Sequence, residues 1–541
     1  MLLDSVVDDR SDRMTPGRST YAGVFLVALA NVMYEMLLTR IFSVTMWYHF
    51  AFMAISMAML GMSAGALAVF LFPAYFPKEK TRQQLSWTAL LFAFSIVIGL
   101  ALHLNASTGS GESLPDPMSF LASFGIVSVP FVVGGMCITL ALTRFSAQVG
   151  AVYAADLLGA ALGCVLLWVA LHLTDGPTAV VATACLAGGA AICFALGTKE
   201  RKLLWGSVAG ALVLLAFCAV QARSPILRIS YVKGRLEAEP LYEKWNSFSR
   251  VTVYGEPDLP GRPFGWGFSP GAALGAVRQL HLLIDATAGT VLTGFDGDTA
   301  KLSYLKHDVT NIAHYLRPRS KVLIIGTGGG RDILSALAFN QPLIRGIDVN
   351  ENIIETVNRR FGDFTGHLDR VDGVSFIHDD ARSYLERTKD AFDIVQISVI
   401  DTWAATSAGA FALAENALYT LEGWSLFLER LRPAGILSVS RFYSEDFPGE
   451  TYRMAALASA ALSRQGVTDT RKHIAIVQRP GGESWGGPYG VATLLLSRSE
   501  FSPRDLDELE QRVGELNFQM LLSPRAAQSD VLAKLATSSR S

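Results

Sequence analysis

Seven apolar stretches in the first 221 residues constrain the fold of this chain more than any other feature of its sequence. They lie at 20–38, 50–75, 86–104, 119–144, 148–173, 177–197 and 203–221. Each is about long enough to cross the hydrocarbon core of a bilayer, where a segment must satisfy its backbone hydrogen bonds internally and therefore forms a helix. The sequence thus predicts an integral membrane protein with about seven transmembrane helices. The polar residues 1–18 lack the basic start and short apolar core of a secretory signal peptide.

The basic residues between the stretches predict how the helices are oriented, because Lys and Arg mark cytoplasmic loops. They precede the first stretch and follow the second, fourth and sixth: Arg10, Arg13, Arg18, Lys78, Lys80, Arg82, Arg144, Lys199, Arg201 and Lys202. The N-terminus is therefore predicted to be cytoplasmic. Seven crossings would then put the C-terminal half outside, where nucleotide cofactors are scarce. Either one of the seven stretches does not cross the membrane, or the C-terminal half binds no such cofactor. The stretch 119–144, which contains Pro130, is the first candidate for one that does not cross.

Ionisable side chains and glycine pairs stand inside the apolar stretches. Arg40 and Asp156 are costly to bury in lipid, so each is either a functional group or reaches the membrane interface. The glycine pairs are Gly61 with Gly65 and Gly159 with Gly163. Their spacing lets two helices approach closely, and we expect them at helix contacts.

The soluble half is organised around a glycine-rich turn at 326–330, between an apolar run at 322–325 and a helical stretch at 332–339. A second predicted strand ends in Asp348, about 20 residues after the turn, as in nucleotide sites. The glycines expected at a cofactor are Gly326, Gly328 and Gly330. They let backbone N–H groups approach a nucleotide at a helix N-terminus, and the acid can bind the ribose hydroxyls. The alternative is a tight turn followed by a solvated aspartate.

Two later predicted strands also end in polar side chains. The run 374–377 leads to Asp380 and Ala381, and the run 392–397 leads to Ser398 and Asp401. Ligands of open α/β sheets bind at the carboxyl ends of the strands. We therefore expect a carboxylate beside the base of the cofactor, and Ser398 and Asp401 where a substrate meets it. Tyr419, in the segment that enters the next helix, is a further candidate.

The segments VLIIGTGGG, GIDVN, HDDAR, FDIVQISVID, ALYTLEGWSLFLERLRPAGIL and ATLLLSR carry a resemblance to a known family. Over about residues 245–500 the chain resembles spermidine synthase, the polyamine aminopropyltransferase, within the class I S-adenosylmethionine-dependent methyltransferase superfamily. The stretches YEMLLTRIFSV and VYAADLLGAALG resemble the membrane domains fused to some bacterial spermidine synthase-like proteins. This likeness implies a bacterial inner membrane protein.

The resemblance implies an α-helical transmembrane domain followed by a Rossmann-like α/β domain of the class I methyltransferase fold, with a small β region before it. The expected parts are a polar tail (1–18), a transmembrane domain (19–221), a linker and β region (222–300), a cofactor-binding domain (301–525) and a C-terminal tail (526–541). A helix is expected at 302–316, directly before the glycine turn.

The resemblance also assigns roles to single residues. It implies that Asp348 binds the ribose and that Asp380 and Ala381 contact adenine. It also implies that Asp401 is the second of two amine-binding acids. Ser398 replaces the first of those acids, which helps to deprotonate the attacking amine. Gly329 stands where the family has an aspartate that recognises the aminopropyl ammonium of decarboxylated S-adenosylmethionine. The family's Tyr–Gln/His–Glu signature is missing at about 308–310.

The two missing acids favour methyl transfer over aminopropyl transfer, because an ammonium tail needs a carboxylate partner and an amine attacks only when neutral. We expect a transferase that uses S-adenosylmethionine or its decarboxylated form. Asp401 would orient or deprotonate the acceptor, with Ser398 and Tyr419 beside it. Arg331 either holds the carboxylate of the intact cofactor or is a solvated residue at a helix start. A true aminopropyltransferase, and a transporter or sensor with a decayed nucleotide module, are the alternatives.

The remaining composition narrows the partners. The formal net charge of −2, without a block of Lys and Arg, argues against nucleic-acid binding. All five cysteines lie in apolar stretches and show neither a disulfide framework nor metal-ligand spacing, so no metal is expected. The expected partners are a small-molecule acceptor (an amine, a lipid or another membrane-soluble compound), membrane lipids and a second copy in a homodimer.

Overall fold

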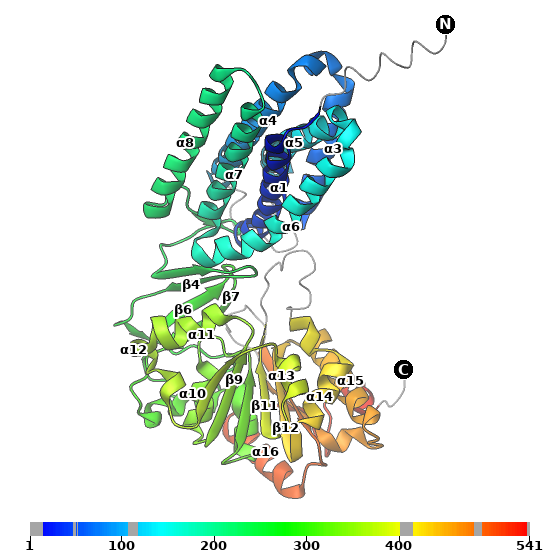
Figure 1. The fold of residues 1–541 in the computed structure, drawn as a ribbon. Helices are drawn as coiled ribbons and strands as arrows, with labels where there is room; N and C mark the ends of the chain where they lie inside the picture. The colour runs from blue at the N-terminus through cyan, green and yellow to red at the C-terminus, as the bar shows by residue number, and fades with distance from the viewer. Residues whose placement is uncertain are drawn as a thin grey trace. The chain divides into compact units, whose positions relative to one another are not determined.

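The computed structural model describes residues 15–46, 50, 52–105, 117–400, 415–480 and 490–537. The chain forms two compact units (Figure 1). Among the described residues, the helical unit runs up to Glu239 and includes Glu243–Arg250. The C-terminal unit comprises Pro240–Tyr242 and the described chain from Val251 onward.

The helical unit contains one long helix for each predicted apolar stretch. They are α1 (Arg18–Thr45), α3 (Met53–Leu71), α4 (Thr81–Asn105), α5 (Pro117–Arg144), α6 (Val149–Leu173), α7 (Gly176–Leu196) and α8 (Arg201–Arg223). All seven are long and apolar enough to cross a membrane, judged over the described residues by length and composition. The prediction of seven helices is confirmed. The helix α5 continues through Pro130.

Both predicted glycine pairs lie where helix backbones meet. A Cβ atom at Gly65 of α3 would stand 2.1 Å from the carbonyl oxygen of Val132 on α5. A Cβ atom at Gly159 of α6 would stand 2.2 Å from the carbonyl oxygen of Phe25 on α1. No residue other than glycine fits such contacts without moving a helix, so the packing interpretation is confirmed. Arg40 is completely buried within this unit.

A small antiparallel region follows in the chain. Its strands are β1 (Tyr231–Val232), β2 (Arg235–Leu236), β3 (Tyr242–Trp245), β4 (Arg250–Tyr254), β5 (Pro260–Gly261), β6 (Val277–Ile284) and β7 (Ala288–Thr293). The strands β1 and β2 form a ladder of their own, and the others form a sheet in the order β3-β4-β6-β5 with β7 paired to β6.

The segment between β7 and the next strand is not the single helix expected at 302–316. It forms 3₁₀ turns at Thr299–His307 and Val309–Asn311, and then the short helix α9 (Ile312–Leu316). The break falls at Asp308, whose backbone is extended and whose side chain caps the second turn by accepting from the N–H of Thr310. An aspartate that binds its own backbone in this way ends a helix.

The centre of the C-terminal unit is a mixed sheet of eight strands. They are β8 (Lys321–Ile325), β9 (Leu343–Asp348), β10 (Val374–His378), β11 (Phe392–Ser398), β12 (Leu431–Tyr443), β13 (Ile474–Arg479), β14 (Gly490–Ser497) and β15 (Gln519–Leu522). Their spatial order is β10-β9-β8-β11-β12-β14-β13-β15. The first five are parallel, and β14 runs antiparallel between β12 and β13. This topology confirms the predicted class I methyltransferase fold.

Helices cover both faces of this sheet. They are α10 (Arg331–Ala338), α11 (Glu351–Glu355), α12 (Gly362–Thr365), α13 (Ala381–Arg387), α14 (Leu421–Glu429), α15 (Gly449–Arg464), α16 (Pro503–Glu515) and α17 (Asp530–Thr537). Alternate residues of β8 belong to two different cores: Ile324 to the core that includes residues of α10 and α16, and Leu323 to the core that includes residues of α14 and α15. Because both faces are covered, the carboxyl edge of the parallel strands is where polar side chains gather.

Candidate cofactor and acceptor site

The glycine turn between β8 and α10 requires its glycines. Gly326, Gly328 and Gly330 have φ angles of 76°, 48° and 85°, in the left-handed region that side chains disfavour. The N–H of Gly326 donates to the carbonyl of Ile347 (2.8 Å), which ties the turn to β9. Helix α10 begins immediately after Gly330, so the turn lies at a helix N-terminus.

Asp348 at the end of β9 holds this turn in place. Its Oδ2 accepts hydrogen bonds from Thr327 Oγ1 (3.1 Å) and from the N–H of Gly328 (3.2 Å), and its Oδ1 accepts from the N–H of Asn350 (2.9 Å). Asp348 is buried, and burial raises the pKa of its carboxyl group. Asp348 is therefore not a solvated aspartate, and its carboxylate fixes the glycine turn.

Asp380 and Ala381 lie at the same edge of the sheet. Strand β10 pairs with β9 so that His378 stands opposite Asp348. Asp380 caps helix α13, because its Oδ1 accepts from the N–H of Ser383 (2.9 Å). Its Oδ2 has no hydrogen-bond partner among the described residues. This oxygen can accept from an adenine amino group, as the resemblance implies.

Arg331 is buried, which excludes the interpretation of a solvated residue. Its Nη2 forms an ion pair with Asp308 Oδ2 (2.5 Å), and its Nη1 donates to Asp332 Oδ1 (3.2 Å). The guanidinium thus stands between two buried carboxylates. Its Nε has no partner within the described part of the chain. No sequence motif singles out Asp308 or Asp332, and the only signal for Asp332 is an acid in the first turn of a helix.

A relay of hydrogen bonds behind the sheet edge fixes Ser398. Gln341 Nε2 donates to His314 Nδ1 (3.2 Å), so the proton of this buried imidazole is on Nε2, which donates to Gln396 Oε1 (2.8 Å). Burial lowers the pKa of His314 to about 4, so the ring is neutral. Gln396 Nε2 then donates to Ser398 Oγ (3.0 Å). The hydroxyl proton of Ser398 is left to donate to Asp332.

Asp332 is therefore a buried carboxylate held by two donors. Burial raises the pKa of this carboxyl group, while the charge of Arg331 and the hydrogen bond from Ser398 oppose part of that rise. The result is a carboxyl group with a raised pKa next to Ser398, where the resemblance places the first amine-binding acid. A carboxylate held in this way can accept a proton.

The chain is strained directly after Ser398. Val399 has a φ angle of 48°, in a region that a β-branched residue rarely adopts, and its N–H donates to the carbonyl of Ser440 (3.0 Å). Strain of this kind gathers at functional sites. Asp401, the predicted acceptor-binding acid, lies outside the described residues.

Tyr419 is linked to the same edge through an arginine. The guanidinium of Arg441, at the end of β12, lies 5.1 Å from the centre of the Tyr419 ring, and its Nη1 donates to the carbonyl of Ile400 (2.9 Å). The structure thus brings Tyr419 close to the segment that follows Ser398. Among the described residues, no group of three or more His, Cys, Asp or Glu side chains could hold a metal ion.

Comparisons with known proteins agree with this fold. No protein-family model matches the chain. A curated relative, polyamine aminopropyltransferase 2 of Pseudomonas aeruginosa, is 29% identical over 205 residues, which are 36% of this chain and 52% of that protein. The chain thus spans about half the length of the curated relative it matches.

Two solved structures are more distant. The spermidine synthase of Thermotoga maritima is 15% identical, with a TM-score of 0.35, and the match covers 55% of this chain and 87% of that one. Human methyltransferase-like protein 13 in complex with SAH is 13% identical, with a TM-score of 0.28, over 42% of this chain and 94% of that one. The strand order and the curated relative together define the C-terminal unit as a spermidine synthase-like class I methyltransferase fold.

Proposed function

We propose that this protein is a membrane-anchored transferase that uses an S-adenosylmethionine-type cofactor. The observation that carries the proposal is the contact between Asp348 and the N–H of Gly328, which joins the ribose-binding acid to the glycine turn. The residues fit such a cofactor. The turn glycines would lie beside its amino-acid part, Asp348 would bind the ribose, and Asp380 and Ala381 would contact the base. The bound cofactor would supply a carbon next to a sulfonium, which a nucleophile attacks.

The geometry around Gly329 supports methyl transfer over aminopropyl transfer. A Cβ atom at this position would stand 2.0 Å from the carbonyl oxygen of Val291 on β7. An aspartate at 329, which the resemblance assigns to the aminopropyl ammonium, therefore has no room without displacing β7. Without that acid a cationic tail has no carboxylate partner at this point of the turn. Intact S-adenosylmethionine suits the site better, and we propose that its carboxylate binds the Nε of Arg331, which has no hydrogen-bond partner among the described residues.

We assign the acceptor's proton to Asp332. When the acceptor gives up its proton, the Asp332 carboxylate would take it. Ser398 and Arg331 orient this carboxylate through their hydrogen bonds. Asp401 remains the proposed residue for orienting the acceptor, with Tyr419 as the neighbouring candidate.

The proposal also includes the membrane. The apolar helices over 19–221 would anchor the catalytic part, 301–525, to a bacterial inner membrane. Seven crossings from a cytoplasmic N-terminus would put this part outside, so the proposal requires that one of the seven helices does not cross. An enzyme held at a bilayer has ready access to a membrane-soluble acceptor, and this architecture supports an acceptor of that kind.

A second candidate is polyamine synthesis with a rearranged amine site. The similarity to polyamine aminopropyltransferase 2 favours it. The two reactions leave different products, because methyl transfer yields adenosylhomocysteine and aminopropyl transfer yields methylthioadenosine. Identification of the nucleoside product after turnover separates them.

Calorimetric titration of the detergent-purified protein with S-adenosylmethionine, and separately with its decarboxylated form, tests the cofactor assignment. We expect tighter binding of the intact cofactor, and a loss of about tenfold or more in affinity for Asp348→Asn. The matched control is Asp372→Asn, which removes an exposed carboxylate from the same unit. Preference for the decarboxylated form would move polyamine synthesis to first place. Binding of neither form would contradict the proposed function.

A further inference from the structure

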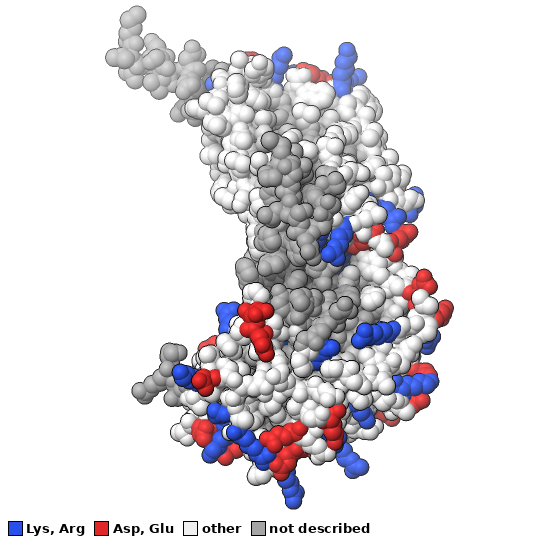
Figure 2. Space-filling view, turned by 180° about the vertical axis from the view of Figure 1, so that it is seen from behind, with Lys and Arg blue, Asp and Glu red and all other residues white. Residues whose placement is uncertain are grey.

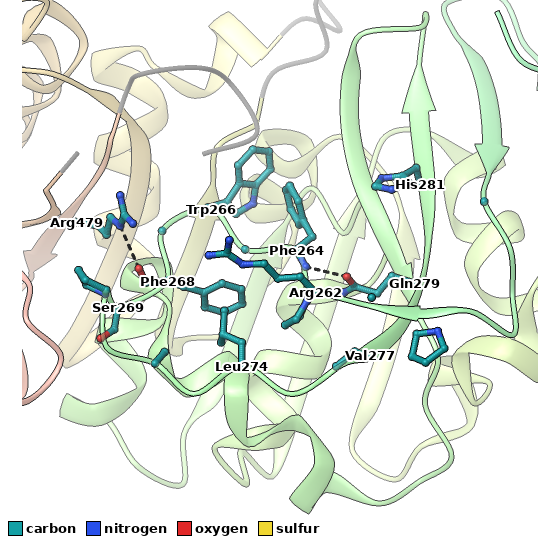
Figure 3. A pocket seen from close by; sticks show the side chains of 18 of the residues that line it. Arg262, Phe264, Trp266, Phe268, Ser269, Leu274, Val277, Gln279, His281 and Arg479 are labelled. Carbon is teal, nitrogen blue, oxygen red and sulfur yellow. Dashed lines mark hydrogen bonds between the residues drawn. The ribbon is translucent and has the colours of Figure 1, made fainter. Parts of the chain in front are cut away.

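A pocket of about 610 Å³ opens in the C-terminal unit beside the candidate site. Its lining comes from the segment 255–281 of the small β region, with Arg479 at the end of β13 and Gly490 at the start of β14 (Figure 3). We propose that this pocket binds the acid group of a small anionic acceptor with a flat apolar body. The inference rests on the proposed function, because it names the class of substrate that the transferase would modify.

The apolar wall of the pocket consists of rings held in fixed positions. Phe264 and Trp266 pack edge to face with their centres 5.0 Å apart, and Trp266 meets Phe442 of β12 in the same way at 6.1 Å. The N–H of Phe264 donates to Gln279 Oε1 (2.8 Å), which joins this loop to β6. Such ordered rings present a face on which a planar ligand can stack.

The charge of the pocket is positive. Its charged lining residues are Arg262, Arg479 and one exposed acid, Glu256. Arg262 forms no hydrogen bond or ion pair with any described residue, and Arg479 donates only its Nε, to the carbonyl of Phe268 (3.1 Å). Figure 3 shows Arg262 extending between Trp266 and Phe268 toward the side where Arg479 lies.

The two guanidinium groups influence each other. Partial burial and the charge of Arg262 lower the pKa of Arg479, against a smaller opposing effect of Asp308. Two positive charges at one cavity repel each other, and a bound anion would offset this repulsion. Guanidinium groups bind carboxylates and phosphates through paired hydrogen bonds. A polyamine carries the wrong charge for this cavity.

The pocket is connected to the candidate site through its own wall. The N–H of Gly267 donates to Asp308 Oδ2 (3.2 Å), and the N–H of Val309 donates to the carbonyl of Gly267 (3.0 Å). Asp308 forms the ion pair with Arg331, which in turn binds Asp332. A ligand whose acid group is held by the arginines would thus lie against the wall that positions the proposed base. These hydrogen bonds and ion pairs connect the pocket to the proposed base, which supports its assignment as the acceptor site.

The test uses three probes with the same ring and different charge: phenylacetate, phenyl phosphate and phenethylamine. Their binding to the full-length protein in detergent is measured by ligand-observed NMR titration. We expect the anions to bind and the amine not to bind. The tighter of the two anions identifies carboxylate or phosphate as the acid group. Equal or tighter binding of phenethylamine would overturn the inference.

The variant Arg262→Gln should weaken binding of the better anion about tenfold, because a charge-assisted contact is lost. The matched control is Arg278→Gln, which removes the same charge from β6 outside the pocket, where Arg278 lies over the ring of Phe364. Its anion binding should equal that of the wild-type protein. Arg262→Glu should bind phenethylamine, which the wild-type protein does not. Unchanged anion binding in Arg262→Gln would refute the assignment.

A cofactor titration separates this inference from the proposed function. Arg262→Gln should bind S-adenosylmethionine as the wild-type protein does, since Arg262 contacts none of the cofactor residues. If the wild-type protein bound the anions but no cofactor, the proposed function and the acceptor role would both be refuted, and an anion site would remain. If it bound the cofactor but no anion, only the acceptor assignment would be wrong.

Discussion

Charged side chains are distributed in opposite ways in the helical and C-terminal units. Among the residues not drawn in grey, the visible face of the helical unit has few charged side chains between its ends, whereas charges of both signs cover the C-terminal unit (Figure 2). In the C-terminal unit the buried Arg331 is also paired with two carboxylates, those of Asp308 and Asp332. The first unit is built to be compatible with lipid, and the second to hold ionised groups in fixed positions.

Both units nevertheless use a glycine where two backbone segments approach closely. Gly159 lets α6 approach the backbone of α1, and Gly329 lets the cofactor turn approach the backbone of β7. In the helical unit the close approach only packs two helices. In the C-terminal unit it leaves no room for a side chain at position 329, which under the proposed function favours the intact cofactor over its decarboxylated form. The same local rule therefore has a structural outcome in one unit and a chemical outcome in the other.

Asp332→Asn should change activity most if buried charges of the C-terminal unit serve chemistry. We expect kcat to fall by about 10²–10⁴-fold, the usual contribution of a general base, with little change in cofactor affinity. Wild-type kcat/KM should rise with pH through the raised pKa of Asp332, and this limb should vanish in the variant. Turnover and calorimetry measure the two effects. A variant with wild-type kcat would show that the cluster is only structural.

The variant Gly159→Val tests the close contact between α6 and α1 in the helical unit. Its new side chain would meet the carbonyl oxygen of Phe25, so we expect a loss of about 3 kcal/mol in stability. Thermal unfolding of the detergent-purified protein measures it. The control is Gly150→Val on the same helix, where a Cβ atom meets nothing within 4 Å. Equal unfolding temperatures for the two variants would contradict the close helix contact.

His314 should make the C-terminal unit sensitive to acid. Its pKa is about 4 in the folded unit and about 6.5 in an unfolded chain, so the unfolded state binds more protons between these values. Stability should therefore fall by about 3 kcal/mol as pH drops from 6.5 to 4. Hydrogen exchange of the β8 and β11 amides follows this loss. His314→Gln should flatten the dependence, and the control His378→Gln, at an exposed ring, should keep it.

Ser398→Ala should have a smaller effect. The hydroxyl of Ser398 lowers the pKa of Asp332, so its removal should move the rising limb of the pH–rate profile to higher pH. The maximal rate should change less than in Asp332→Asn, because the carboxylate remains. A profile recorded with saturating cofactor measures the shift, and Ser375→Ala on the exposed side of β10 is the control. A shift to lower pH would contradict the donor role of Ser398.

Much of the fold could be predicted from the sequence because the signals are local. Hydropathy over a single helix length identified all seven apolar helices, and the strand–glycine–helix–acid order located the turn and Asp348. The expected helix at 302–316 was wrong because the side chain of Asp308 accepts from the nearby backbone N–H of Thr310 and interrupts the helix there. Asp308 also pairs with Arg331 of another helix. Hydrophobic periodicity does not show that a side chain competes with the helix for a backbone N–H group.

The sequence by itself determined the class of the protein: an apolar helical part and a nucleotide-type α/β part with glycines and an acid at the expected places. Only the tertiary structure brought Asp308, Asp332 and Ser398 together, from three elements separated by many residues. It also decided that Arg262 and Arg479 face one pocket. The physical reason is that hydrophobic patterns and turn residues act within one element, whereas the pKa of a carboxyl group and the charge of a cavity depend on neighbours that only the packed sheet supplies.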